Sequence, residues 1–201
     1  MPDSDFFIRF GLFVIKEFLD AQLCAELRSE MFSSKLTSAA VVQGYTSRVS
    51  ESERKTKEAK VSALTISFVY NRLIALKPGL EKHFNLTLNG CEKPQFLVYN
   101  EGDFFLPHVD GEDNLDKPQY FRDRQVSIVV FLNEESKEPA PDTYCGGGLT
   151  FYGLIDDPKW KKYGFQLNGE TGLMIAFRSG LLHEVKPVTH GTRFAIVSWF
   201  F

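Results

Sequence analysis

Residues 97–110 read Leu-Val-Tyr-Asn-Glu-Gly-Asp-Phe-Phe-Leu-Pro-His-Val-Asp, which is two apolar, aromatic runs separated by a short polar stretch. Aromatic and β-branched residues of this kind favour strands. His108 and Asp110 close the stretch. Two residues apart on a strand, their side chains project from the same face of the sheet. A single His-X-Asp triplet occurs by chance in many chains, so its meaning depends on what surrounds it.

From this stretch to the end, the chain reads as one short strand after another, with glycine and proline between them. The predicted strands are Phe104–Asp110, Gln125–Leu132, Gly148–Tyr152, Gly172–Phe177, Leu182–Val188 and Arg193–Phe201. Just upstream, Asn89-Gly90 is a strong turn signal and predicts a hairpin between Leu86–Leu88 and Gln95–Tyr99. These runs predict a β-sandwich or barrel.

The N-terminal part instead predicts helices and a polar connection. Phe13–Ile15 reads as a short strand, and Asp20 is a candidate N-cap for a helix that runs to about Phe32. Ser67–Phe84 reads as a second helix, broken or kinked by a Pro-Gly pair. The polar stretch Ser33–Lys60 between them reads as a loop or mobile lid. We expect an α+β, mainly β chain that forms a single domain over residues 1–201.

Composition narrows the function classes. A chain of 201 residues fits one domain and can bury its own core without disulfides. A net charge of −3 provides no strong positive field, so we expect no nucleic-acid partner. The apolar segment 6–18 is too short and too charged to span a membrane and is no signal peptide. The three widely spaced cysteines fit neither a disulfide framework nor a zinc knuckle, which favours the reducing cytoplasm.

A second histidine gives the His-X-Asp triplet its meaning. His183 lies 73 residues after Asp110, on another predicted strand. Two histidines and one carboxylate can occupy one face of a metal octahedron and leave three positions open, which is the arrangement of non-haem Fe(II) oxygenases. The same ligands could hold a catalytic zinc with a bound water, so a zinc hydrolase stays open at this point.

Arg193 follows His183 by ten residues. If Thr189-His190-Gly191 formed a three-residue hairpin loop with Gly191 in the left-handed conformation, Arg193 would lie opposite Pro187, on the sheet face of His183. A guanidinium presents a planar fork that matches a carboxylate bidentately. This register predicts that Arg193 takes the far end of a metal-bound diacid.

Four stretches in this order resemble the prolyl 4-hydroxylase-like family of Fe(II)/2-oxoglutarate dioxygenases. They are 97–110, the strand from Arg124 to Asn133, the Gly-Gly-Leu-Thr-Phe run at 147–151, and 183–199 with its His-Glu-Val-Lys-Pro-Val and Gly-Thr-Arg. The resemblance covers residues 95–201 well and the polar lid hardly at all. It implies a double-stranded β-helix (jelly-roll, cupin-like) catalytic core over 95–201, with residues 1–94 as flanking helical support and lid.

The resemblance also implies roles for individual residues. His108, Asp110 and His183 would bind Fe(II), and Arg193 would pair with the distal carboxylate of 2-oxoglutarate. Tyr99 would offer its hydroxyl to this cosubstrate. The family's prolyl hydroxylases often carry a second tyrosine where this chain has Phe131, so one hydroxyl partner is missing, and Thr150 or a water could replace it. Because halogenases of the superfamily lack the carboxylate, Asp110 predicts hydroxylation.

The expected substrate is a prolyl residue of a peptide or protein, with succinate and CO2 as coproducts and O2 as the oxidant. A free amino acid or another small metabolite is the alternative. A catalytically silent jelly-roll module that uses its cleft only for binding is the alternative from another class. Arg124 is a candidate for holding a substrate carboxylate or carbonyl. We also expect that ascorbate serves as a reductant and that the protein is a monomer or weak homodimer.

Overall fold

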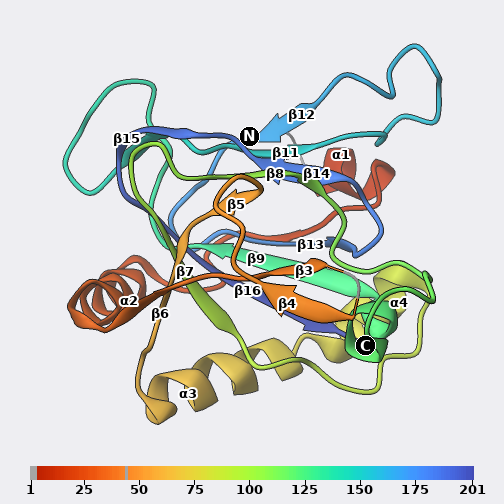
Figure 1. Ribbon diagram of the computed structural model, residues 1–201, viewed down its shortest axis with the longest axis horizontal. Helices are drawn as coiled ribbons and strands as arrows, with labels where there is room; N and C mark the ends of the chain where they lie inside the picture. The colour runs from red at the N-terminus through yellow and green to blue at the C-terminus, as the bar shows by residue number, and fades with distance from the viewer. Residues whose placement is uncertain (1–3, 44) are drawn as a thin grey trace.

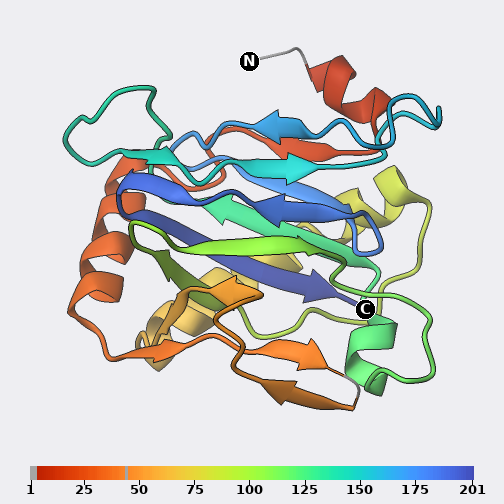
Figure 2. The ribbon, with the colours of Figure 1, turned by 45° about the horizontal axis from the view of Figure 1, so that its top comes forward.

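The computed structural model describes residues 4–43 and 45–201, and its centre is two facing β-sheets (Figures 1 and 2). The larger sheet has seven strands, in spatial order β1 (Phe13–Ile15), β13 (Met174–Arg178), β9 (Val126–Phe131), β16 (Arg193–Phe200), β7 (Gln95–Tyr99), β6 (Lys57–Ala59) and β2 (Leu36–Ser38). The smaller sheet has five, in spatial order β12 (Phe165–Leu167), β11 (Leu149–Phe151), β14 (His183–Val185), β8 (Phe104–His108) and β5 (Arg54–Lys55).

Two further strand pairs flank these sheets. They are β10 (Tyr144–Gly146) with β15 (Val188–Gly191), and β3 (Val41–Gln43) with β4 (Thr46–Arg48). All the pairings between these strands are antiparallel. The mainly β jelly-roll predicted from the sequence is therefore confirmed.

Both faces of the large sheet are buried, one under the helices and the other against the small sheet. Side chains alternate along each strand, so neighbouring residues belong to different cores. On β7, Phe96 and Val98 belong to the core under the helices, whereas Leu97 and Tyr99 belong to the core between the two sheets. The helices on the outer face are α2 (Ala21–Ser33), α3 (Ala63–Ile74) and α4 (Lys77–Phe84) (Figure 1). Two short helices complete the chain, α1 (Ser4–Arg9) and α5 (Gln119–Asp123). This arrangement leaves the inner space between the sheets for the site.

Several helix boundaries follow the local signals. Asp20 caps α2, because its carboxylate accepts a hydrogen bond from the Leu23 N–H at 2.8 Å. The predicted second helix is two helices, and Pro78 lies in the first turn of α4, where its missing N–H costs nothing. None of the helices in the described ranges has the length and hydrophobicity needed to cross a bilayer.

The prediction of a loop over 33–60 is wrong. This stretch contains β2 to β6, and three of these strands join the main sheets, with β6 pairing with β7 and β5 pairing with β8. Each is only two or three residues long, too short to show a period in the sequence. The N-terminal part therefore supplies strands to both sheets as well as helices.

Two predicted hairpins are also wrong. Asn89 and Gly90 donate their N–H groups to the Phe201 carbonyl, so this turn holds the C-terminus and Leu86–Leu88 forms no strand. The chain after His183 makes a wide crossing in place of a tight hairpin, because β14 lies in the small sheet, β16 lies in the large sheet, and β15 pairs with β10. Gly191 does have a positive φ of 74°. Arg193 consequently lies opposite Tyr99 and not opposite Pro187.

Candidate active site

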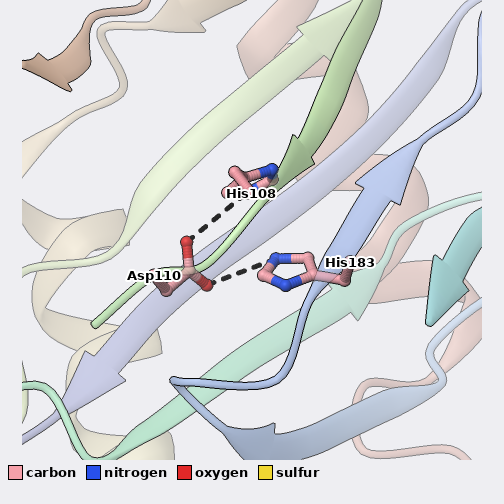
Figure 3. Close-up of side chains that lie close together, drawn as sticks. All are labelled: His108, Asp110 and His183. Atoms are coloured by element: carbon pink, nitrogen blue, oxygen red, sulfur yellow. Dashed lines mark ion pairs between the residues drawn. The ribbon is translucent and has the colours of Figure 1, made fainter. Parts of the chain in front are cut away.

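Three side chains from two neighbouring strands converge between the sheets. His108 ends β8, Asp110 follows it, and His183 begins β14, where it pairs directly with His108. Their ligand atoms all lie within 4.8 Å of one another. The Nε2 atoms of His108 and His183 are each 3.5 Å from a carboxylate oxygen of Asp110 (Figure 3). The structure therefore brings together the three residues that the sequence predicted as metal ligands.

Backbone carbonyls set the orientation of both imidazoles. The Nδ1 atom of His108 lies 2.8 Å from the Leu106 carbonyl, and the Nδ1 atom of His183 lies 2.8 Å from the Leu181 carbonyl. A carbonyl can only accept, so each Nδ1 carries the proton and each Nε2 presents its lone pair. This is the supporting arrangement that metal-binding histidines use.

An irregularity in the small sheet adds an aromatic neighbour. The register shifts between β14 and β8, so that the three residues from His183 to Val185 face the four residues from Phe105 to His108. This extra residue brings Phe105 to the face of His108. The two rings stack with centroids 3.4 Å apart, and the Phe177 ring meets His183 edge-on at 4.7 Å. The Phe105 and Phe177 rings thus restrict the orientations of the two imidazoles.

Electrostatics keeps these groups in the protonation states that bind a metal. Burial raises the pKa of the Asp110 carboxyl, but the two imidazoles and the indole N–H of Trp199 outweigh it and hold the pKa well below its usual range. Burial lowers the pKa of His183 to about 4, His108 adds to this effect and Asp110 opposes it. At neutral pH the site therefore offers one carboxylate and a neutral His183.

Arg193 lies on the same inner face, between two aromatic rings. Its guanidinium carbon is 5.0 Å from the centre of the Tyr99 ring and 5.2 Å from that of Phe131. The side chain is only 1% exposed, no carboxylate of the described residues forms an ion pair with it, and its Nε has no hydrogen-bond partner among them. An unpaired buried guanidinium is costly and calls for an anion.

Tyr144 is a residue of this group that the sequence reasoning missed. It lies on β10 and is fully buried, and its hydroxyl is beside Arg193 without a well-formed hydrogen bond. Burial raises the pKa of Tyr144 to about 12, although the Arg193 charge opposes this. A Cβ at Gly147 would lie 3.1 Å from Arg193 and 3.3 Å from the Tyr144 ring, so bare backbone packs against both. The signal available in the sequence was this tyrosine, which stands shortly before the glycine run 146–148.

The structure does not place Thr150 as predicted. Leu149 and Phe151 on either side point into the core between the sheets, so Thr150 points to the opposite face of the small sheet. There a Cβ at Gly164 would lie 2.4 Å from its methyl group. Alternation on a three-residue strand therefore excludes Thr150 as a cosubstrate ligand, and Tyr144 is the hydroxyl beside Arg193.

Arg124 is placed near the site, but its guanidinium is already paired. Its Nε and Nη2 donate to the two carboxylate oxygens of Glu92 at 2.5 and 2.8 Å. It stacks on Trp199 at 3.7 Å and donates to the Asp110 carbonyl at 3.3 Å. The substrate contact predicted for Arg124 is therefore wrong for this arrangement, because its fork supports Trp199 and the Asp110 backbone and is not free for a substrate carboxylate.

One cavity of about 530 Å³ joins these groups. Its lining includes the three candidate metal ligands, Tyr99 and Arg193, and it continues outward between residues 40–58 and 110–124. The lone pairs of the ligand set and the unpaired guanidinium at the inner end fit a metal with three protein ligands and a diacid beside it. The residues present thus fit Fe(II) and 2-oxoglutarate.

Comparison with known proteins agrees with this geometry. The family model described as "2OG-Fe(II) oxygenase superfamily" matches residues 94–201. A PKHD-type hydroxylase of Synechococcus sp. (strain JA-2-3B'a(2-13)) is 24% identical over 179 residues, which cover 87% of this chain and 70% of that protein. A PKHD-type hydroxylase of Burkholderia ambifaria (strain MC40-6) is 36% identical over 112 residues, which cover 55% of this chain and 43% of that protein.

Solved structures show the same fold. A Pseudomonas putida prolyl-4-hydroxylase superposes with a TM-score of 0.65 at 23% identity, covering 94% of this chain and 91% of that one. A Trichoplax adhaerens prolyl hydroxylase, in complex with a hypoxia inducible factor peptide fragment, superposes with a TM-score of 0.67 at 21% identity, covering 98% and 88%. The family favours catalysis over a silent binding module or a zinc hydrolase. This chain belongs to the 2OG-Fe(II) oxygenase superfamily and is a 2-oxoglutarate-dependent non-haem iron dioxygenase.

Proposed function

We propose that this dioxygenase hydroxylates a prolyl residue of a peptide or protein. The observation that carries the proposal is the convergence of His108, Asp110 and His183 beside the unpaired Arg193 in one cavity. When bound, Fe(II), 2-oxoglutarate and O2 supply the oxidation, in which the cosubstrate becomes succinate and CO2 and the substrate gains one hydroxyl. The protein binds and orients these groups and excludes water.

The chain's own residues divide this work. His108, Asp110 and His183 would hold the iron, and the Leu106 and Leu181 carbonyls set the tautomers of the two imidazoles. Because Asp110 provides the carboxylate ligand, we expect hydroxylation rather than halogenation.

At the inner end of the cavity, Arg193 pairs with the distal carboxylate of 2-oxoglutarate and Tyr99 offers its hydroxyl to the cosubstrate. Tyr144 does not line the cavity, but its hydroxyl lies beside Arg193 and is a second candidate donor. The Tyr144 proton has no acceptor among the described residues, which leaves it for a carboxylate held by Arg193.

The prolyl substrate is supported by the relatives. The Pseudomonas putida neighbour is described as a prolyl-4-hydroxylase, and the Trichoplax adhaerens neighbour is a prolyl hydroxylase with a peptide bound. The outer part of the cavity, between residues 40–58 and 110–124, gives room for such a chain. A free amino acid or other small metabolite is the alternative substrate.

The remaining expectations stay predictions. Residues 1–201 act as one catalytic domain, since strands from both sides of residue 94 build both sheets. The three cysteines are free, which supports the cytoplasm. A monomer or weak homodimer and the use of ascorbate are tested by solution measurements.

The test of the function is substrate-dependent turnover. The Fe(II)-loaded chain is incubated with 2-oxoglutarate and a panel of proline-containing peptides and free amino acids, and succinate and the mass gain of one oxygen atom are measured. We expect succinate in every reaction, through uncoupled turnover, and more of it together with the mass gain when a prolyl peptide fits. A mass gain only on free amino acids would refute the prolyl peptide substrate and support the alternative. Absence of succinate in every reaction would refute the dioxygenase activity.

A further inference from the structure

The outer part of the cavity holds a cation that nothing in the described chain neutralises. The basic side chains that line the cavity are Arg54, Lys117, Arg124 and Arg193. Arg124 has Glu92, and Arg193 is assigned to the cosubstrate. Lys117 is half-buried, so its ammonium, which lies 5.4 Å from the centre of the Phe121 ring, keeps access to water. Arg54 is only 7% exposed, yet no carboxylate of residues 4–43 and 45–201 forms an ion pair with it. Burial of an unpaired cation is costly unless an anion joins it.

The position of Arg54 links it to the metal site. It lies on β5, directly opposite Phe105 of β8. Its guanidinium carbon is 4.8 Å from the centre of the Phe105 ring, and that ring stacks on His108. Arg54 is thus one aromatic ring away from a candidate iron ligand, on the part of the cavity wall that residues 40–58 build.

Most of the hydrogen-bonding capacity of Arg54 is unused. Its Nη1 donates to the Ala40 carbonyl at 2.8 Å, and its buried Nε has no hydrogen-bond partner among the described residues. A guanidinium has five N–H donors, so the single bond to Ala40 leaves the fork available. The fork geometry matches a carboxylate better than any neutral acceptor.

The neighbouring acids do not supply this partner. The Glu53 carboxylate accepts hydrogen bonds from Arg48 at 2.9 Å and from Ser50 at 3.0 Å. Glu58 pairs with Lys60 at 2.8 Å. Each acid of this part of the lining therefore already has a donor, and the guanidinium stays unneutralised.

We propose that Arg54 binds a carboxylate of the substrate and that this enzyme acts on carboxylate-bearing substrates. The inference rests on the proposed hydroxylase function and narrows its substrate class. The carboxylate has three possible sources with the same chemistry, namely a free amino acid, the C-terminus of a peptide, and an acidic side chain next to the target residue.

The first test compares matched pairs on the unaltered enzyme. The pairs are L-proline against L-prolinamide, Ac-Ala-Pro-Ala with a free against an amidated C-terminus, and Ac-Ala-Glu-Pro-Ala-amide against its Gln counterpart. Binding is measured by calorimetry on the chain loaded with Mn(II) and 2-oxoglutarate without O2. We expect the acid of at least one pair to bind about tenfold to a hundredfold more tightly than its amide, and the preferred pair identifies the source.

The second test removes the charge. Arg54→Gln should abolish the preference for the acid, and Arg54→Lys, which keeps the charge without the fork, should retain part of it. Arg9→Gln, which removes an exposed positive charge outside the cavity lining, is the matched control and should leave the preference unchanged. If Arg54 only fastens the Ala40 backbone, Arg54→Gln lowers the melting temperature and leaves the acid-to-amide ratio unchanged.

The outcomes separate this inference from the function itself. Succinate formation by the Fe(II)-loaded enzyme, coupled or uncoupled, tests the dioxygenase and does not depend on Arg54. With that activity present, equal or undetectable binding of acids and amides in all three pairs would overturn the role of Arg54, as would an acid preference that survives in Arg54→Gln. Without succinate formation, the proposed function fails whatever the binding shows.

Discussion

The two ends of the cavity are built differently. At the inner end, His108, His183 and Arg193 lie on strands that each have a paired strand on both sides. Backbone carbonyls orient both imidazoles. At the mouth, exposed side chains hold short segments together. The Tyr45 hydroxyl donates to the Leu115 carbonyl at 2.6 Å, and the Ser47 and Tyr120 hydroxyls are 3.0 Å apart.

This difference separates chemistry from recognition. Ligands on paired strands are held to a fixed geometry by many ladder hydrogen bonds, as an iron site requires. The segments that meet at the mouth lie on the surface and are joined by single side-chain bonds, so they can change without disturbing the metal. We therefore expect substitutions at the inner end to impair the binding of the metal or of 2-oxoglutarate, and substitutions at the mouth to change substrate affinity.

The largest effect is expected from Asp110→Ala. It removes the carboxylate ligand and leaves two imidazoles, so metal binding and succinate formation should both be lost. The measurements are the metal content of the reconstituted chain and 2-oxoglutarate turnover. Asp113→Ala is the matched control, since Asp113 lies in the same loop, its side chain is 90% exposed, and its one ion pair within the described residues is with Arg122. A variant at Asp110 that retains a full equivalent of iron would contradict the ligand assignment.

Arg193→Met should come next and should separate cosubstrate from metal. It removes the cation for the distal carboxylate but leaves the ligand set intact. We expect the KM for 2-oxoglutarate to rise about a hundredfold, because losing one partner of a buried charge pair costs about 2–5 kcal/mol. Metal content should stay at the level of the unaltered chain. An unchanged KM would place the distal carboxylate elsewhere in the cavity.

Tyr144→Phe removes only a hydroxyl from the same group. One hydrogen bond to a charged acceptor contributes about 1.5–3 kcal/mol, so the affinity for 2-oxoglutarate should fall about tenfold to a hundredfold. Fluorescence or calorimetric titration of the Mn(II)-loaded chain measures it. Tyr152→Phe is the control, because the Tyr152 hydroxyl bonds to Glu184 on the outer face of the small sheet. Equal affinities of the two variants would remove Tyr144 from the cosubstrate site.

These residues also show where sequence reasoning succeeds. The clustering of His108, Asp110 and His183, and the presence of Arg193 in the same cavity, could be predicted because each residue stands in a motif with a fixed spacing and a distinct chemical type. The mainly β fold could be predicted because the strands after residue 95 are apolar runs bounded by glycine and proline. In both cases the local sequence carries the information.

The failures have physical causes. Thr150 was offered as a replacement hydroxyl although its strand is only three residues long, which is too short for the sequence pattern to show which sheet face the side chain takes. Arg193 was paired with the wrong residue because partners in a jelly-roll are distant in sequence, and the chain from His183 crosses between sheets. Arg54 and Tyr144 were missed because they lie in stretches with little apolar pattern, and only the fold shows that their charge and hydroxyl are buried.

The smallest effect is expected at the mouth, from Ser47→Ala. It removes the hydroxyl that meets Tyr120 and so loosens the contact between the β3–β4 hairpin and α5. An exposed hydrogen bond contributes about 0.5–1.5 kcal/mol, so the KM for the substrate should rise about threefold, while the KM for 2-oxoglutarate stays unchanged. Steady-state kinetics with each substrate varied in turn measures both, and Ser33→Ala on the exposed surface of α2 serves as the control. If Ser47→Ala instead raised the KM for 2-oxoglutarate, the two ends of the cavity would be coupled, and the separation of chemistry from recognition would not hold for this enzyme.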